Sequence, residues 1–142
     1  MKRRMVLGFV LVLFAVALVP PLSAQLDTRV LKADIPFSFY MEGRQFPAGE
    51  YRIGWAGGLI HIYNMDGTLQ ASVISFRIES RKTNERSYLR FNSYGSRVQF
   101  LSQIWIAGND YGREFLKSKA EVEVAKKNST QTYAMVRLGV AR

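Results

Sequence analysis

The sequence contains no cysteine and a single histidine, His61. Without cysteine the chain forms no disulfide, so its stability must come from an apolar core. The same shortage excludes zinc sites built on Cys and His ligands, and catalysis by a Cys–His pair. There is no P-loop and no G-x-G-x-x-G motif, and a faint calcium-loop pattern at 64–67 lacks the usual spacing and terminal Glu. The sequence therefore predicts no cofactor and no metal site.

Acidic side chains are scarce, with 11 Asp and Glu against 20 Lys and Arg and a formal net charge of +9 at pH 7. The basic residues are scattered, and the densest patch, at 77–86, also holds two Glu. A nucleic-acid-binding surface gathers basic side chains and stacking aromatics on one face, so we expect no nucleic-acid partner. Two interpretations of the charge stay open: a well-solvated surface, or attraction to an anionic polysaccharide or an envelope lipid.

The chain has one long apolar run, Met5–Val19, close to its N-terminus. The run follows three basic residues and precedes a cleavage-like site that ends at Ala24, which is the pattern of a secretory signal peptide. At about 15 residues it is shorter than the roughly 20 that span a bilayer. We therefore expect a signal peptide over 1–24 and export to the periplasm or the extracellular space. The rest, 25–142, would be a single β-rich domain with no transmembrane segment.

The stretch 89–106 predicts two strands joined by a tight turn at Tyr94-Gly95. The second of these strands, over 97–106, is aromatic and β-branched, as strands prefer. Because it is apolar on both faces it must be covered on both sides, so we expect it at the centre of the sheet. Period-2 alternation divides its large side chains between the two faces, Phe100 with Ile104 and Leu101 with Trp105.

Alternating apolar and polar residues predict further strands, over 29–41, 51–55, 59–63, 69–78 and 133–140. Pro36 has no N–H to donate, so it favours an edge position or a bulge in the first of them. A change of parity between Val73 and Ile74 predicts a bulge in the fourth. About seven strands with frequent turns indicate an all-β fold, either an antiparallel sandwich or a small barrel.

One short helix is expected near the C-terminus. Ser118 and Glu121 have the spacing of a capping box, in which the Glu side chain also returns to the backbone N–H of the N-cap residue. The helix would span 119–128 and turn Ala120 and Val124 toward the core. Because it is short, it must be stabilised by tertiary packing.

Two segments, 35–53 and 89–121, contain distinctive short phrases: Pro-Ala-Gly-Glu-Tyr at 47–51, Ser-Gln-Ile-Trp at 102–105, Gly-Arg-Glu at 112–114, and Ser118. In these segments, which cover most of the mature chain, the sequence resembles a family of short exported bacterial proteins of unassigned function. The resemblance implies export and brings no activity with it. Phe115 and Leu116 stand where that family often has Leu-Pro after the Arg-Glu pair, which leaves the entry to the helix open.

Three residues are the best candidates for catalysis, and each has a plainer explanation. His61 lies between Ile60 and Ile62 in a strand, and no G-x-S-x-G elbow accompanies it. Asp110 and Glu114 would be a carboxylate pair, the arrangement of many glycosidases. However, Asp110 belongs to a glycine-bounded turn and Glu114 follows an arginine with which it can pair. We therefore predict that the chain is not an enzyme and has no catalytic residue.

Aromatic side chains near turns are the remaining candidates for a site. Trp and Tyr rings at the end of a β-fold stack on sugars or hold a partner, although most such rings simply pack in the core. We select five residues on this ground, four near turns and one on the second face of the central strand: Tyr40, Trp55, Tyr94, Tyr111 and Trp105.

These observations favour a small exported binding or interaction module without catalytic activity, with a polysaccharide or another envelope component as the partner class to consider. A cell-envelope structural protein is the alternative, and a carboxylate-based hydrolase is a third hypothesis. A pocket lined by aromatic side chains would favour the first, a flat apolar patch the second, and two carboxylates converging in a cleft the third.

Overall fold

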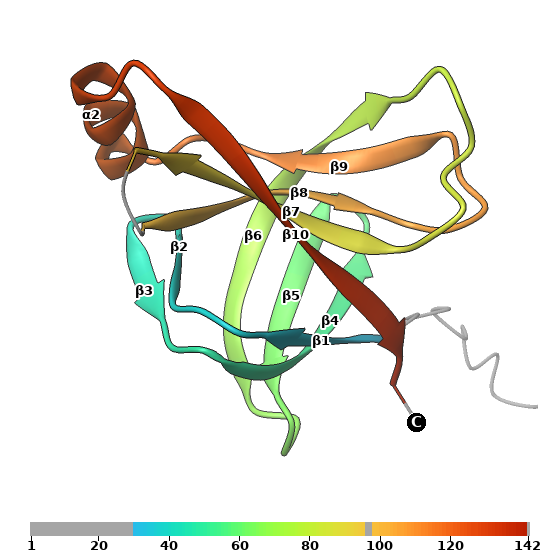
Figure 1. Cartoon of the computed structure of the whole chain (residues 1–142). Helices are drawn as coiled ribbons and strands as arrows, with labels where there is room; N and C mark the ends of the chain where they lie inside the picture. Colours follow the sequence, from blue (N-terminus) through green and yellow to red (C-terminus); the bar gives the residue numbers. More distant parts are fainter. Residues whose placement is uncertain (1–29, 96–97, 142) are drawn as a thin grey trace, which may run out of the picture.

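The computed structural model describes residues 30–95 and 98–141. Its strands form a barrel with a helix on the outside (Figure 1). The signal peptide expected over 1–24 lies outside the described residues, as do residues 96 and 97. Within the described part, no helix is both long enough and apolar enough to cross a membrane.

Eight antiparallel strands close the barrel. β8 (Gln99–Trp105) lies between β7 (Tyr88–Tyr94) and β9 (Tyr111–Phe115), and its pairing with β9 completes the circle. From β7 the order continues through β10 (Gln131–Val140), β1 (Leu31–Ile35), β4 (Gly49–Ala56), β5 (Leu59–Asn64) and β6 (Leu69–Glu79), which pairs with β9. The predicted all-β class with one short C-terminal helix is confirmed, and of the two architectures left open the protein forms the barrel.

A small hairpin extends the sheet beside β8. β2 (Phe39–Met41) pairs in parallel with the first half of β8, and β3 (Arg44–Phe46) pairs with β2. β8 therefore has strands on both sides, as its central position in the prediction requires. The single strand expected over 29–41 is broken at Pro36, which cannot donate to a ladder. The two hairpin strands and β9, which was expected to be a turn and loop, raise the count of described strands from about seven to ten.

Apolar side chains fill the barrel, and aromatic rings close one end of it. We call this the closed end and define it by five rings: Phe37, Phe39, Phe46, Tyr51 and Phe91. The ring of Phe39 is fully buried, and its centroid lies 5.2 to 5.6 Å from those of three others. Each such ring removes about 150–250 Å² from water, so this cluster is a major source of stability.

Both predicted faces of β8 are wrong, because the strand contains a bulge. The register against β7 shifts at Ser102, which is the extra residue. As a result, Leu101 and Ile104 both point into the barrel. Phe100, expected beside Ile104, lies on the outer side instead. It is still buried there, because the rings of two tyrosines pack against it.

The irregularity in β6 also lies elsewhere than predicted. The register against β5 shifts at Gln70, whereas Val73 and Ile74 continue the regular alternation. Val73 is buried and Ile74 is 61% exposed. The change of parity in the sequence therefore reflects apolar side chains on the outer surface and not a bulge.

The helix, α2 (Lys119–Lys127), begins where the sequence predicts. Ser118 is its N-cap, and its hydroxyl oxygen accepts a hydrogen bond from the backbone N–H of Glu121 at 3.2 Å. The second half of the capping box is wrong, because the buried Glu121 side chain accepts hydrogen bonds from two side chains of β7 instead. Ala120 is exposed, so the helix turns Glu121 and Val124 toward the barrel.

Candidate functional site

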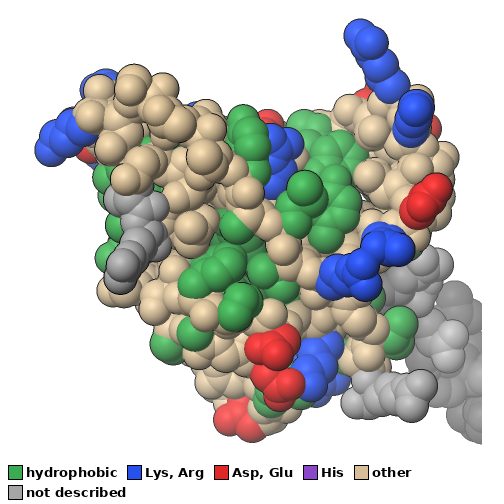
Figure 2. All heavy atoms as spheres, in the orientation of Figure 1, with side chains coloured by type: hydrophobic (Ala, Val, Ile, Leu, Met, Phe, Trp, Pro, Cys, Tyr) green, Lys and Arg blue, Asp and Glu red, His purple; other side chains and the backbone are tan. Residues whose placement is uncertain are grey.

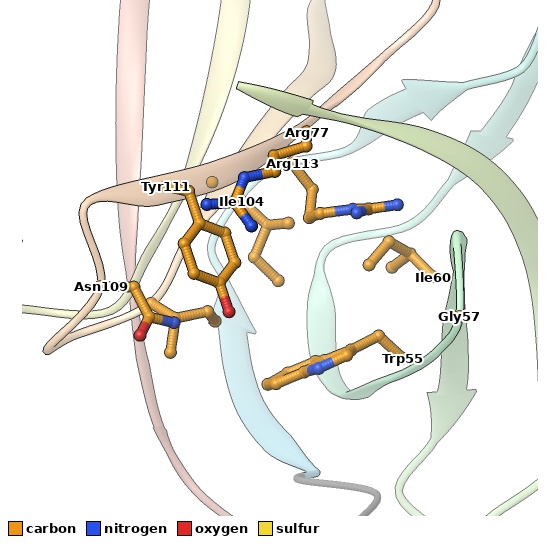
Figure 3. Close-up of a pocket in the computed structure, with 10 residues that line it drawn as sticks. Trp55, Gly57, Ile60, Arg77, Ile104, Asn109, Tyr111 and Arg113 are labelled. Carbon is orange, nitrogen blue, oxygen red and sulfur yellow. The ribbon is translucent and has the colours of Figure 1, made fainter. Parts of the chain in front are cut away.

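The end of the barrel opposite the closed end holds a cavity of about 430 Å³, a volume typical of small-ligand sites. We call it the open-end pocket (Figure 3). Strands from both halves of the chain contribute to its lining. The side chains that give it its chemistry and shape are Trp55, Ile60, Arg77, Asn109, Tyr111 and Arg113.

Strand alternation explains why two arginines point into this pocket. On β6, Arg77 lies two residues after the buried Ser75, and on β9, Arg113 lies two residues before the buried Phe115. Residues two apart on a strand share a face. Ser75 is the register partner of Phe115, and Arg77 is the register partner of Arg113. Both arginines therefore stand on the inner face of the barrel wall, at its open end.

The guanidinium group of Arg113 is fixed by the neighbouring strand. Its Nε donates to Ser75 Oγ at 2.9 Å, and a terminal nitrogen donates to the backbone oxygen of Ser75 at 2.7 Å. The Ser75 hydroxyl in turn donates to the backbone oxygen of Gly58 at 2.9 Å. This chain of bonds links β9 to the turn between β4 and β5 and holds the guanidinium beside the pocket.

Aromatic groups form the other walls. The guanidinium of Arg77 lies over the ring of Tyr111, with its central carbon 4.0 Å from the ring centroid. Figure 3 shows the Tyr111 hydroxyl pointing toward the indole of Trp55, which lies across the pocket from the two arginines. Trp55 comes from the end of β4 and is half-buried. The pocket thus offers two aromatic surfaces and two cationic groups to whatever enters it.

Of the five aromatic residues predicted for a site, the structure brings two together. Trp55 and Tyr111 both line the open-end pocket. Tyr40 lies on β2, away from it, and is half-buried. Tyr94 and Trp105 do not line it either, and they are only 2% and 8% exposed, so the expectation that these two rings are open to a ligand is wrong.

Tyr94 and Trp105 are covered for identifiable reasons. The hydroxyl of Tyr94 donates to Glu121 on α2 at 2.9 Å, and burial raises its pKa above the usual value. Trp105 packs on Gly112, where an added Cβ would come within 2.7 Å of two indole carbons. The indole Nε1 of Trp105 donates to Gln103 Oε1 at 2.9 Å. Both rings are therefore engaged within the fold.

The three candidate catalytic residues do not converge. The Glu114 carboxylate lies on the outside of β9, where it accepts a hydrogen bond from Gln103 Nε2 at 3.0 Å. Asp110 is exposed in the turn before β9. His61 is on the outer side of β5, with Nδ1 2.6 Å from Ser72 Oγ, and no carboxylate of the described residues bonds to its ring. Nor do the described residues contain a group of three or more His, Cys, Asp or Glu side chains placed to hold a metal ion.

Sequence reasoning missed the polar groups of the pocket, Arg77, Asn109 and Arg113. It left the basic charge open between a solvated surface and attraction to a polyanion, without singling out Arg77, and it interpreted the arginine before Glu114 as an ion-pair partner. For Arg77 a signal was present, because it shares the parity of the apolar Val73, but the bulge predicted after Val73 turned the opposite parity inward. For Arg113 there was no such signal, since the strand that carries it was not predicted.

The chain matches no family model, no curated protein and no solved structure with which it was compared.

Proposed function

We propose that the protein is a small exported binding module without catalytic activity that holds its ligand in the open-end pocket. The observation that carries this proposal is the presence of Trp55, Tyr111 and two guanidinium groups around one cavity at the mouth of the barrel. Ligand sites combine apolar and aromatic walls with a few polar groups that fix orientation. Here the walls also include Ile60 and Ile104, and the amide of Asn109 adds to the polar groups.

The chemistry of the lining supports a binding role over a catalytic one. Guanidinium, amide, aromatic and aliphatic groups line the pocket, and the described lining contains no carboxylate and no imidazole. Arginine stays protonated in proteins, so it does not serve as a general base. Export is proposed from the signal-peptide pattern over 1–24.

The test is a binding screen with the protein that begins at Gln25. Neutral oligosaccharides, acidic oligosaccharides and soluble lipid headgroups are screened by thermal shift, and hits are measured by calorimetry. Trp55→Ala removes the ring from the pocket, and Tyr40→Ala is the matched control that removes a ring elsewhere. We expect a ligand of the unmodified protein to bind about tenfold more weakly to Trp55→Ala, a loss of roughly 1.4 kcal/mol, and equally well to Tyr40→Ala.

Three outcomes would contradict the proposal. A ligand whose affinity is unchanged in Trp55→Ala would place the site elsewhere on the protein. A panel in which nothing binds would count against a binding module of this kind. Turnover of a ligand by the purified protein would contradict the non-catalytic role.

One observation favours the cell-envelope structural alternative. Ile74 and Phe76 on the outside of β6 are 61% and 49% exposed, and Leu59, the register partner of Ile74, is 39% exposed. Apolar side chains also lie in the open on the face drawn in Figure 2, close to Lys and Arg. Contiguous exposed apolar side chains mark contact surfaces.

Sedimentation equilibrium tests this second role. If the patch joins copies of the chain, the protein will form oligomers that Ile74→Lys dissociates. Thr83→Lys, which adds the same charge to an exposed loop, is the control and should not change the mass. A monomer at high concentration would exclude self-association through this patch.

A further inference from the structure

The open-end pocket carries positive charge that nearby carboxylates hardly offset. Arg77 and Arg113 are register partners, and like charges directly opposite one another destabilise an antiparallel pair. Arg77 has a loose contact with Glu79, at 3.9 Å between two largely exposed side chains. Arg113 makes no ion pair within the described part of the chain. The barrel therefore maintains two cations side by side at a cavity wall, an arrangement that a bound anion would relieve.

Arg113 is also held in place before any ligand arrives. Ser75, which accepts two of its hydrogen bonds, is only 5% exposed and is itself bonded to the β4–β5 turn. A guanidinium has five N–H groups, so three remain for a ligand. A group that is already ordered loses little entropy on binding, and the planar guanidinium matches a carboxylate with two parallel hydrogen bonds.

The aromatic walls narrow the choice of anion. One face of a sugar ring presents C–H groups, which pack on the electron-rich face of an indole such as that of Trp55. The hydroxyls at the edge of the ring can bond to an amide such as that of Asn109, which has both a donor and an acceptor. A bare phosphate or sulfate would leave Trp55 uncovered, and a neutral sugar would leave the two arginines without a counter-charge.

We propose that the open-end pocket recognises an acidic saccharide, namely a uronic-acid unit whose carboxylate is bound by Arg77 and Arg113 and whose ring stacks on Trp55. This inference rests on the binding role proposed above and names the class of ligand. Because the pocket lies at the mouth of the barrel, the remainder of a polysaccharide chain can continue into solvent. The net positive charge of the protein would favour its approach to such a polyanion.

The first experiment is calorimetry with the protein that begins at Gln25 and a matched pair of probes. One probe is an oligogalacturonate, and the other is the same oligosaccharide with its carboxyl groups reduced to alcohols. We expect the acidic probe to bind about tenfold or more tightly than the reduced one, since charge-assisted hydrogen bonds to a carboxylate are lost. Raising the salt concentration should weaken the binding of the acidic probe.

Three variants, one of them a control, test whether the preference for the acidic probe arises in the pocket. Arg77→Gln removes an exposed guanidinium and should weaken binding of the acidic probe by about tenfold. Arg113→Lys keeps the charge but loses the planar fork, so it should also weaken binding. Arg52→Gln is the matched control, because it removes the same charge from the outer face of β4, the strand that carries Trp55. Thermal unfolding of each variant checks that the barrel is intact.

The outcomes separate the two proposals. Equal affinity for the acidic and reduced probes, or an unchanged affinity in Arg77→Gln, would overturn the acidic-saccharide inference. If either result were found while Trp55→Ala still weakened the binding of the probe, the binding role of the pocket would stand. Inorganic phosphate that competes as tightly as the oligogalacturonate would point to a simple anion site and overturn the inference. Failure of both probes would overturn it as well, and the wider panel would then decide the binding role.

Discussion

The two ends of the barrel are built from the same strands but are packed in opposite ways. At the closed end, aromatic rings from the hairpin and the barrel wall fill the space, and Phe39 and Phe91 are entirely buried. At the open end, Trp55 is half-buried and two guanidinium groups flank a cavity of about 430 Å³. Binding sites commonly depart from the packing and charge rules that the rest of a fold obeys. The closed end therefore stabilises the barrel, whereas the open end leaves the space in which we propose that a ligand binds.

The difference between the ends has a topological cause. Along its first half β8 pairs with β2, so the hairpin of β2 and β3 is placed over the closed end. Along its second half β8 pairs with β9, which directs Arg113 into the barrel opposite Ile104. One strand thus joins the aromatic cluster at one end to the cationic pocket at the other.

The strongest test of the comparison is to remove a ring from each end. Phe39→Ala should lower the free energy of unfolding by about 3–5 kcal/mol, the usual cost of truncating a fully buried Phe. Trp55→Ala should cost clearly less, because that ring is half-buried at the edge of a cavity. Urea unfolding measures both. An equal or larger loss for Trp55→Ala would show that the open end is as important for stability as the closed end.

A second test probes a tightly packed contact beside the open-end pocket. Gly112→Ala would place a Cβ within 2.7 Å of the Trp105 ring and 2.8 Å of the backbone oxygen of Ile104. Since a backbone atom cannot move aside, we expect a loss of about 1–3 kcal/mol in urea unfolding. Gly139→Ala is the matched control, because a Cβ there meets nothing within 4 Å. Similar stabilities for the two variants would mean that Trp105 is not held against β9.

A third test concerns the helix that covers Tyr94. Ser118→Ala removes the N-cap hydroxyl and should cost about 1 kcal/mol of stability. Ser129→Ala, an exposed position just after the helix, is the control and should have almost no effect. Because α2 lies away from the open-end pocket, ligand affinity should be the same in both variants. A loss of ligand affinity in Ser118→Ala would contradict the view that α2 contributes to stability but not to binding.

The smallest effect is expected from pH. Burial raises the pKa of Tyr51, whose hydroxyl donates to the backbone oxygen of Pro47 at 2.7 Å. Since its folded pKa exceeds the unfolded value of 10.0, this contribution to stability is complete below that pH and is lost as the pH rises through the folded pKa. Urea unfolding above pH 10 should show this fall, with a shallower slope in Tyr51→Phe. The same slope in both proteins would mean that Tyr51 is not buried in this way.

Sequence-based prediction succeeded where the controlling interactions are local. The all-β class follows from alternation along each strand, and the helix begins after Ser118 because an N-cap acts on the backbone three residues ahead. Prediction failed where one extra residue changes the relative facing of the side chains before and after it. The bulge at Ser102 puts Phe100 on the face opposite to Ile104, and nothing in the local sequence around Ser102 predicts it.

The candidate site shows the same division. Trp55 and Tyr111 could be selected from the sequence, because aromatic residues beside turns are unusual enough to be noticed. Tyr94 was selected for the same reason and is buried, since its cover comes from a helix more than 20 residues along the chain. The carboxylate of Glu121 reaches two side chains of β7 in place of its own helix terminus, which no local pattern could indicate.

By itself the sequence determined the class of the fold, the helix with its N-cap, and the central position of β8, because alternation, capping and two-sided apolarity act within a few residues. Only the tertiary structure decided that the sheet closes through β8 and β9, which end is filled by aromatic rings, and that Arg77 meets Arg113. These features depend on pairing between strands that lie far apart in the chain. A like-charged pair at a cavity wall exists only once that pairing has formed, and this is why the pocket could not be found in the sequence.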